Sequence, residues 1–493
     1  MLMGRIPSEY LRLPFFFVRR QWANSYVIAQ CYSLWGNPSH LDYLSSALQE
    51  RYGESQLYIL KAQRNAGSFT YDGIELGGER MAYEIEDTLD QLAAKGYRIR
   101  KLSVVGYSLG GLVARYALGL LDARGWLDKL EPVNFTTFVA PHVGVRTPSK
   151  GFHSHIWNVM GARALSMSGR QLFMIDSFRD TGRPLLSILA DPDSIFMRAL
   201  TKFKHRCLYA NIFSDRATVY YTAAISKVDP FMELENVDFK YVKGYEPNII
   251  DSDQPLLPKT KRTPTTTASS YASRQFFKAI IQLPLILFLS VVAPIATICF
   301  LLNSVFQTIC SHRRIRLHEE GKTGVVFGSY RVPLVVQEVR NAVEDVFESM
   351  NASQKSEYLT DSSDDFEGQT ELRWRPKEPS FLSPCEKEDS FMDDECTALI
   401  GQMETAQEHD VVEGQNFQSP HVDCSTSGFP TLALTPSQFA IIDSLNSLGF
   451  RKYPVYIHNH RHSHAAIIVR MPKKGFEEGR TVVKHWLDTE FKV

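Results

Sequence analysis

The chain has 493 residues, of which 44% are hydrophobic and 22% are charged, and its formal net charge is -1. A chain of this length can form more than one domain. Because the charges balance, no basic surface favours DNA or RNA, and nucleic acid is not an expected partner. The seven cysteines are scattered, odd in number and without metal-ligand spacing, which fits a reducing compartment better than a disulfide framework.

The first half of the chain alternates short apolar runs with stretches of helical spacing. Residues 1–25 are atypical, since their apolar core is too short and wrongly flanked for a secretory signal. From about residue 26 to 250 the alternation predicts a mainly parallel sheet with crossover helices. Bulky apolar side chains at about 150–200 form either ordinary core or a lid-like wall. The predicted strands are residues 26–29, 57–60, 102–105, 135–139 and 207–210.

The segment GYSLGG, residues 106–111, joins a predicted strand to a predicted helix. Strand, sharp turn and helix around Gly-x-Ser-x-Gly are the context of a nucleophile elbow: the glycines let two backbones approach, and the turn exposes the serine hydroxyl. The helix N-terminus favours negative charge on an attacked carbonyl oxygen. We therefore predict that Ser108 is a nucleophile, and the alternative is a plain glycine-rich turn.

A nucleophilic serine needs a base, and the base needs an orienting carboxylate, in the chain order serine, acid, histidine. Asp215 stands on a loop just past the strand at 207–210, where such folds gather catalytic groups. We predict Asp215 as the acid, against the alternative of a loop carboxylate that caps the next helix. Less well placed acids in the lid-like segment are Asp176, Asp180, Asp191 and Asp193.

The base is sought among four histidines between residues 458 and 464. No acidic or cysteine cluster accompanies them, so they do not predict a metal site. The apolar runs at 455–457 and 465–469 predict the last strands, and a short loop between them could carry an imidazole over the sheet edge to the serine. We predict His464 as the base, with His462 as the alternative.

An oxyanion hole needs two backbone N–H donors. We expect one from Leu109, the residue after the nucleophile, and the other from Leu34, in the loop that follows the first strand. Chemistry of this kind requires no cofactor and no metal.

Beyond residue 250 the composition changes several times. Residues 251–275 are rich in Pro, Thr and Ser and predict a linker. We expect a helical return segment at 313–350, and the acidic, Ser-rich residues 351–430 predict disorder because they cannot bury enough apolar surface. Residues 431–493 return to the predicted parallel-sheet core and carry the base, and Thr435 followed by a proline predicts a helix start.

The strongest signal in the middle of the chain is a membrane segment at 276–312. Residues 279–312 contain no Asp, Glu, Lys or Arg, and basic residues stand on both sides. A single span would separate the acid from the base, and two full spans need about 40 apolar residues. We therefore predict a shallow hairpin bent near Pro294, which suits a lipid monolayer, with a simple transmembrane anchor as the alternative.

Several separated blocks, in this order, resemble the serine esterase and lipase family of the α/β-hydrolases, which includes fungal lipid-droplet phospholipases. The resemblance covers most of residues 26–250 and 430–470, and it implies that Ser108 is the nucleophile, Asp215 the acid and His464 the base, with acyl esters of lipids as substrates. The blocks are residues 34–38, 73–80, 106–111, 141–144, Asp215 with its neighbours, and 462–466.

One block departs from the family. The family has His-Gly before Leu-Trp-Gly, whereas this chain has Tyr32-Ser33. Glycine permits backbone angles that Ser33 resists, so the sequence predicts a strained or displaced oxyanion loop. We expect a hydrolase of glycerophospholipids or acylglycerols at a lipid droplet or intracellular membrane, with the catalytic part on the cytosolic side. The alternatives are a catalytically impaired scaffold and a lipid acyltransferase, and the sequence does not give the oligomeric state.

Overall fold

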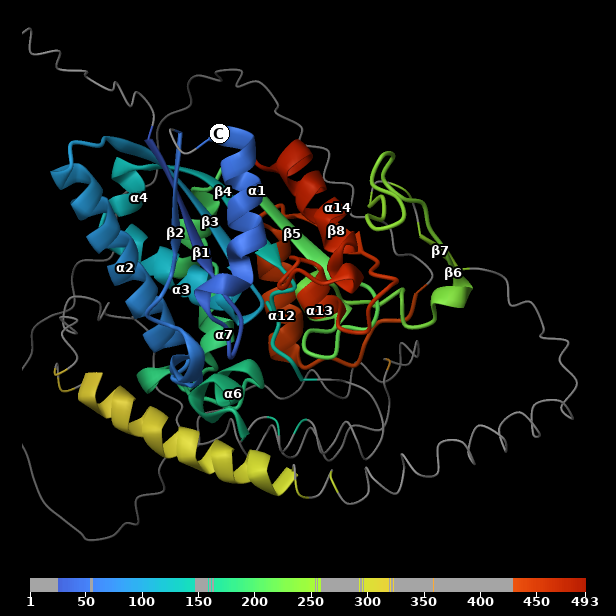
Figure 1. The fold of residues 1–493 in the computed structure, drawn as a ribbon. Coiled ribbons are helices and arrows are strands. Elements are labelled where there is room, and N and C mark those ends of the chain that lie inside the picture. The colour runs from blue at the N-terminus through green and yellow to red at the C-terminus, as the bar shows by residue number, and fades with distance from the viewer. Residues whose placement is uncertain are drawn as a thin grey trace, which may run out of the picture. The chain divides into compact units, whose positions relative to one another are not determined.

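The computed structural model describes residues 25–53, 56–146, 164–252, 256–258, 297–318 and 429–493, with isolated positions between them. Its core is a six-stranded sheet in the order β2-β1-β3-β4-β5-β8, and every neighbouring pair is parallel (Figure 1). The mainly parallel sheet expected from the sequence is therefore confirmed. The strands are β1 (Ser25–Cys31), β2 (Leu57–Lys61), β3 (Ile99–Tyr107), β4 (Glu131–Phe138), β5 (His205–Asn211) and β8 (Arg451–Val455), with a separate pair β6 (Val237–Asp238) and β7 (Leu257–Pro258).

Helices cover both faces of this sheet, as crossover connections between parallel strands require. One apolar core lies under α1 and α14, and the other lies under α2, α3 and α12 (Figure 1). The α-helices are α1 (Asp42–Tyr52), α2 (Ile74–Ala94), α3 (Leu109–Ala123), α4 (Trp126–Lys129), α6 (Ser166–Leu172), α7 (Leu185–Leu189), α8 (Ile195–Thr201), α9 (Tyr220–Ala223), α12 (Pro436–Asn446), α13 (Ser463–Ala466) and α14 (Glu478–His485). The shorter turns are η1 (Pro38–Leu41), η2 (Gly67–Tyr71), η3 (Arg179–Thr181), η4 (Leu234–Asn236), η6 (Lys474–Phe476) and η7 (Trp486–Glu490).

The helix start predicted after residue 434 is confirmed at α12. Thr435 Oγ1 accepts from Gln438 N at 3.2 Å, and Gln438 Oε1 accepts from Thr435 N at 3.1 Å, which completes a capping box with proline at the first helical position. Gly449, with φ of +68°, follows this helix and lets the chain turn into β8. This start signal returns the chain to the sheet.

The strand order places one switch point beside the elbow. β1 pairs with β2 on one side and with β3 on the other. The strand order therefore reverses at β1, because the chain adds β2 on one side of it and all later strands of the sheet on the other side. Ligands of open α/β sheets bind at the carboxyl ends of the strands at such a point. The loops that leave β1 and β3 at this edge are those predicted to carry Leu34 and Ser108.

The strand predicted at 465–469 is wrong, and the strand predicted at 455–457 lies slightly earlier, as β8. Residues 465–469 continue from α13 in helical and turn geometry, with Ile467 N donating to Ser463 O and Val469 N to Ala466 O, both at 3.0 Å. Ala466 and Ile467 are fully buried, so the apolar run correctly indicated that these residues lie in the core. A run this short carries no period, which is why strand and helix could not be distinguished.

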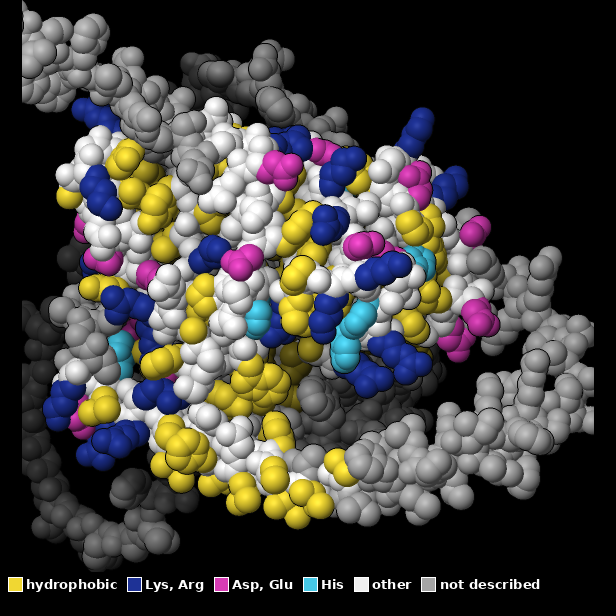
Figure 2. Space-filling model, viewed as in Figure 1, with side chains coloured by type: hydrophobic (Ala, Val, Ile, Leu, Met, Phe, Trp, Pro, Cys, Tyr) yellow, Lys and Arg dark blue, Asp and Glu magenta, His cyan; other side chains and the backbone are white. Residues whose placement is uncertain are grey.

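In the predicted membrane segment the structure describes a helix at residues 297–318, drawn in yellow in Figure 1, which extends past the expected boundary at 312. Its polar side faces the hydrolase core, where Ser304 Oγ donates to Ala164 O at 2.6 Å and Ser311 Oγ to Tyr71 O at 3.3 Å. Its apolar side is exposed, as the hydrophobic side chains along it in Figure 2 show. The exposed side chains include Ile298, Leu302, Val305, Phe306 and Ile309.

Within the described part of the chain, no helix is both long enough and apolar enough to cross a membrane. The bend expected near Pro294, the N-terminal residues 1–24, most of the linker and the acidic insert lie outside the described residues. The hairpin therefore stays a prediction. The apolar side chains of the lid-like segment that the structure describes are buried in the core, among them Leu172, Phe173 and Met174.

Candidate active site

The elbow holds Ser108 in a strained backbone conformation between β3 and α3. Ser108 has φ of +55° and ψ of -129°, a region that L-residues rarely adopt, and such strain persists only where the surroundings impose it. Its N–H donates to Phe138 O at 2.9 Å, which ties the turn to the end of β4. The hydroxyl makes no cap bond to α3, so it is not consumed by the helix it precedes.

The glycines of the elbow are required by close backbone contacts. A Cβ added at Gly106 would lie 2.4 Å from Gly111 Cα, and one added at Gly110 would lie 2.4 Å from Cys31 O. Carbon atoms do not approach backbone atoms this closely, so only glycine fits at either position. The contact with Cys31 also brings the end of β1, and with it the loop that carries Leu34, directly beside the N-terminus of α3.

Asp215 lies on the loop after β5 and is held by five hydrogen bonds. Oδ1 accepts from Ala217 N at 3.0 Å and from Thr218 N at 2.8 Å, and Oδ2 accepts from Asn211 Nδ2 at 3.0 Å. The other two bonds join both oxygens to His464 Nδ1, at 3.1 and 2.9 Å. The carboxylate is almost completely buried, so these donors replace the water that it has lost.

The structure brings His464 to Asp215 across 249 residues of sequence. An ionised carboxylate only accepts hydrogen bonds, so the imidazole carries its proton on Nδ1 and leaves the Nε2 lone pair free to take up a proton. Two contacts fix the loop that carries it: Tyr107 Oη donates to His464 O at 2.8 Å, and Ser463 Oγ donates to Phe213 O at 2.9 Å. Burial raises the pKa of Tyr107, which keeps this donor protonated.

Tyr107 immediately precedes Ser108, and its ring centroid lies 5.2 Å from that of His464. The elbow and the histidine loop are therefore neighbours at the carboxyl edge of the sheet. His462, the alternative base, is exposed and its ring packs on His460 at 5.4 Å, away from Asp215. The structure brings Asp215 together with His464 and not with His462.

The loop after β1 is strained at a different residue from the one expected. Ser33 is not in the left-handed region, whereas Trp35 is, with φ of +54°. Gly36 is the residue that must be glycine, because a Cβ there would lie 2.5 Å from Ser33 O. The strain predicted for this loop is therefore present, but it falls on Trp35 and not on Ser33. Leu34 lies at the start of that turn, and Leu109 opens α3.

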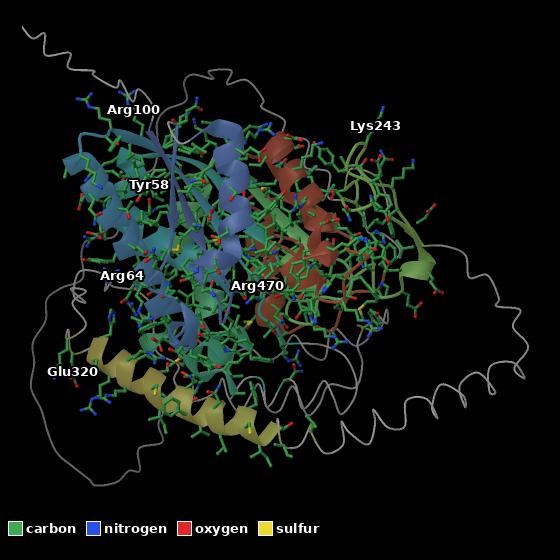
Figure 3. All side chains as sticks on the ribbon, viewed as in Figure 1. Tyr58, Arg64, Arg100, Lys243, Glu320 and Arg470 are labelled. Carbon is green, nitrogen blue, oxygen red and sulfur yellow. The ribbon has the colours of Figure 1, made fainter. Side chains whose placement is uncertain are left out.

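A partly buried basic group stands near this edge. Arg470 lies between α13 and the start of α1 (Figure 3), and its Nη2 is 3.0 Å from His40 Nε2. Burial, together with the positive charge of Arg470, lowers the pKa of His40 to about 4, so this imidazole is neutral at pH 7. His40 therefore adds no charge to the site.

Sequence analysis missed the residues that hold the acid and the base. Asn211 ends β5 four positions before Asp215, and Tyr107 is the variable residue inside the elbow motif. Asn211 belongs to no spaced pattern, and Tyr107 fills a position that the motif leaves open to any residue, so no local signal pointed to either. Among the described residues, no group of three or more His, Cys, Asp or Glu side chains could hold a metal ion.

The parallel sheet, the elbow after β3 and the acid–histidine pair beyond β5 and β8 are the features of the α/β-hydrolase fold. Comparison with known families narrows the class further. Residues 27–227 match the family described as "Putative serine esterase (DUF676)", so the resemblance seen in the sequence is confirmed for this part of the chain.

Two yeast proteins are similar to this chain. "Putative lipase ROG1" of Saccharomyces cerevisiae is 29% identical over 250 residues, which are 50% of this chain and 32% of that protein. "Putative lipase C4A8.10" of Schizosaccharomyces pombe is 27% identical over 242 residues, 47% of this chain and 30% of that protein. The matched region thus spans about a third of each yeast protein.

Among solved structures, an extracellular α/β-hydrolase from a Paenibacillus species overlaps with 14% identity and a TM-score of 0.17, over 23% of this chain and 40% of that one. The fold class rests on the sheet order and the elbow of this chain and not on that overlap.

Proposed function

We propose that this protein is a serine hydrolase that cleaves carboxylic ester bonds of lipids, most simply glycerophospholipids or acylglycerols. Ser108 attacks the acyl carbonyl, and His464 Nε2 takes the hydroxyl proton and passes it to the leaving alcohol. Asp215 holds the imidazole in the required tautomer, and the N–H groups of Leu109 and Leu34 stabilise the oxyanion. Water then hydrolyses the acyl-enzyme with the same histidine as base.

The observation that carries this proposal is the Asp215–His464 pair at 2.9 Å, placed on the loops of neighbouring strands beside the strained serine. A buried carboxylate that accepts from His464 and from three further donors is more than a plain loop acid requires. The pair orients the one histidine nitrogen that a serine hydroxyl needs as a base.

A lipid substrate is favoured by the outward face of the helix at 297–318. Ile298, Leu302, Val305 and Ile309 follow helical spacing, and all are more than half exposed. A contiguous apolar face of this kind marks an interaction surface, and its sequence continues N-terminally as a run without charged residues. We therefore propose that residues 276–312 attach the protein to a lipid droplet or an intracellular membrane, with the catalytic part on the cytosolic side.

Covalent labelling tests the proposed chemistry. Full-length protein incubated with a fluorophosphonate probe is expected to react at one residue, and Ser108→Ala is expected to abolish the labelling without changing the thermal unfolding midpoint. Folded wild-type protein that takes up no probe would refute the serine mechanism and favour a scaffold. Labelling that persists in Ser108→Ala would refute the assignment of the nucleophile.

Product analysis tests the substrate class. The purified protein is incubated with vesicles of glycerophospholipid or with emulsified acylglycerol, and release of free fatty acid is measured with and without added lysolipid. Free fatty acid as the main product supports hydrolysis. Transfer of the acyl chain to the lysolipid would instead make the protein an acyltransferase, and a lack of turnover with every lipid, together with turnover of short soluble esters, would contradict the lipid substrate.

A further inference from the structure

The polar side of the helix at 297–318 makes charged and hydrogen-bonded contacts with the hydrolase core. Arg314 reaches the buried carboxylate of Asp72, with Nε at 2.9 Å from Oδ2 and Nη2 at 2.7 Å from Oδ1. The same guanidinium donates to Ser68 O at 2.9 Å. The Asp72 side chain is 0% exposed and also pairs with Arg80 at 2.8 Å. Arg314 is one of the basic residues that follow the charge-free run, and its side chain points into the protein.

These contacts converge on one short segment, residues 67–72, which is η2 and its cap Asp72. Ser311 Oγ donates to Tyr71 O, and Arg314 lies over the ring of Phe69 at 5.2 Å from its centroid. One turn further along the helix, His318 Nε2 lies 2.7 Å from Glu79 Oε2, and both side chains are buried. Charge-assisted bonds such as Arg314–Asp72 are among the stronger hydrogen bonds, so they hold the helix against η2.

The other side of η2 holds the candidate oxyanion loop. The Trp35 N–H donates to Thr70 Oγ1 at 3.0 Å, and its indole Nε1–H donates to Tyr71 Oη at 2.7 Å. Gly67 N donates to Gly36 O at 2.9 Å. Three hydrogen bonds thus join η2 to the two residues that follow Leu34.

Trp35 needs this support because its conformation is strained. A non-glycine residue at φ of +54° costs of order 1 to 3 kcal/mol and persists only where neighbours over-determine it. The neighbours here are the backbone and side chains of η2. A shift of η2 would release Trp35 and with it the N–H of Leu34, one residue away.

We propose that the helix at 297–318 is a positioning element of the active site, which holds the oxyanion loop in place through η2. Arg314 and Tyr71 are its positioning residues. This inference rests on the proposed function, since it assigns the loop its role in catalysis. The helix, which belongs to the long insertion between the acid and the base, then contributes to the activity in two ways: its outer face contacts lipid, and its inner face supports the loop.

The test compares two arginines of the same helix in the full-length protein. Arg314→Gln removes the contact with Asp72, and Asp72 keeps Arg80, so no buried carboxylate is left unpaired. Arg316→Gln is the matched control, because Arg316 is 80% exposed and pairs with Glu320 at the outer end of the helix (Figure 3). The substrate is a short water-soluble ester, p-nitrophenyl butyrate, whose turnover needs no lipid surface.

Arg314→Gln is expected to lower kcat roughly 10- to 100-fold with KM within about twofold, because a displaced oxyanion donor acts on the transition state and not on binding. Arg316→Gln is expected to match the wild type. Arg314→Lys should recover part of kcat, because it keeps one charged contact but not the planar fork. Amide hydrogen exchange of residues 33–37 should be faster in Arg314→Gln than in either the control or the wild type.

Equal kcat and equal exchange of residues 33–37 in Arg314→Gln and Arg316→Gln would overturn the inference. If Arg314→Gln fails to fold, Tyr71→Phe replaces it: the change removes only the acceptor of Trp35 Nε1, and an unchanged kcat with unchanged exchange would again refute the role. Exchange is measured on the protein whether or not it hydrolyses esters. A wild type without esterase activity would therefore remove the proposed function, while the exchange result still decides whether the helix holds the loop.

Discussion

Substitution of Gly110 by alanine, which adds one methyl group, is the most direct test of the geometry of the site. A Cβ at residue 110 would lie 2.4 Å from Cys31 O and 2.8 Å from Tyr32 N. Ordinary contact begins at 3.4 Å and almost nothing lies below 3.0 Å, so the loop after β1 must retreat by about 0.6 to 1.0 Å. The atoms that must move are backbone, and no side-chain rotation can relieve the clash.

Gly110→Ala is therefore expected to lower kcat for p-nitrophenyl butyrate by about 100-fold, since a misplacement of about 1 Å in a catalytic arrangement costs roughly that factor. KM should change little, because a short ester makes few contacts with the displaced loop. The rate of fluorophosphonate labelling should fall in parallel, because that reaction also builds negative charge on an oxygen held by the same donors.

Gly119→Ala is the matched control on the same helix. Its Cβ would lie 2.3 Å from the ring of Phe196, on the side of α3 that faces α8, far along the helix from the elbow. Overpacking of this kind destabilises by roughly 1 to 3 kcal/mol and should lower the unfolding midpoint without lowering kcat. A folded Gly110→Ala protein whose kcat stays within about threefold of the wild type would show that the loop after β1 does not supply an oxyanion donor.

Two further predictions follow from the site and its surroundings. His464→Gln should reduce esterase kcat at least roughly 1,000-fold, and His462→Gln should leave it close to wild type, so the reverse pattern would reassign the base. Burial raises the pKa of Asp176 from its ordinary 3.8 to about 7. The wild type therefore loses stability as pH rises from about 4 to about 7, because the unfolded chain releases the Asp176 proton in this range while the folded protein retains it. Asp176→Asn has no such proton to release and does not lose stability in this way. At about 1.4 kcal/mol per pKa unit the difference approaches about 4 kcal/mol. The unfolding midpoints of variant and wild type should therefore diverge between about pH 4 and pH 7 in favour of the variant, and midpoints that run parallel over this range would contradict the shift.

The elbow and the acid could be found from the sequence because their signals are local. Ser108 lies in a spaced glycine motif between two periodic segments, and Asp215 follows a recognisable strand. Chain order alone limited the search for the base to a short run of histidines that includes His464. Its exact position depended on a loop whose path the sequence misdescribed, since the residues after it are helical and not a strand.

The supports of the site could not be predicted because they are contacts between distant segments. Trp35 carries the strain expected at Ser33, since the angles of the loop are set by η2 and not by the residue that replaces the family's glycine. Likewise the charge-free run indicated an apolar helix, but it did not show toward which part of the protein its polar side chains point. Ser304, Ser311 and His318 recur every seven residues and face the core, a stripe that becomes meaningful only when the helix is seen packed against α2 and η2.

The position of the acid and the base restricts how the long insertion can meet a membrane. β5 and β8 are parallel neighbours, with Asn211 beside Val455, so the chain leaves and re-enters the sheet at adjacent strands of one folded body. Both flanks of the insertion therefore belong to one folded body, which requires them to lie on the same side of any bilayer. The helix at 297–318 adds a second restriction, because Arg314 and His318 bind residues of the hydrolase core directly. Because these contacts fix one end of the helix to the core, any lipid contact of this helix would be limited to the depth that its outer apolar side chains reach.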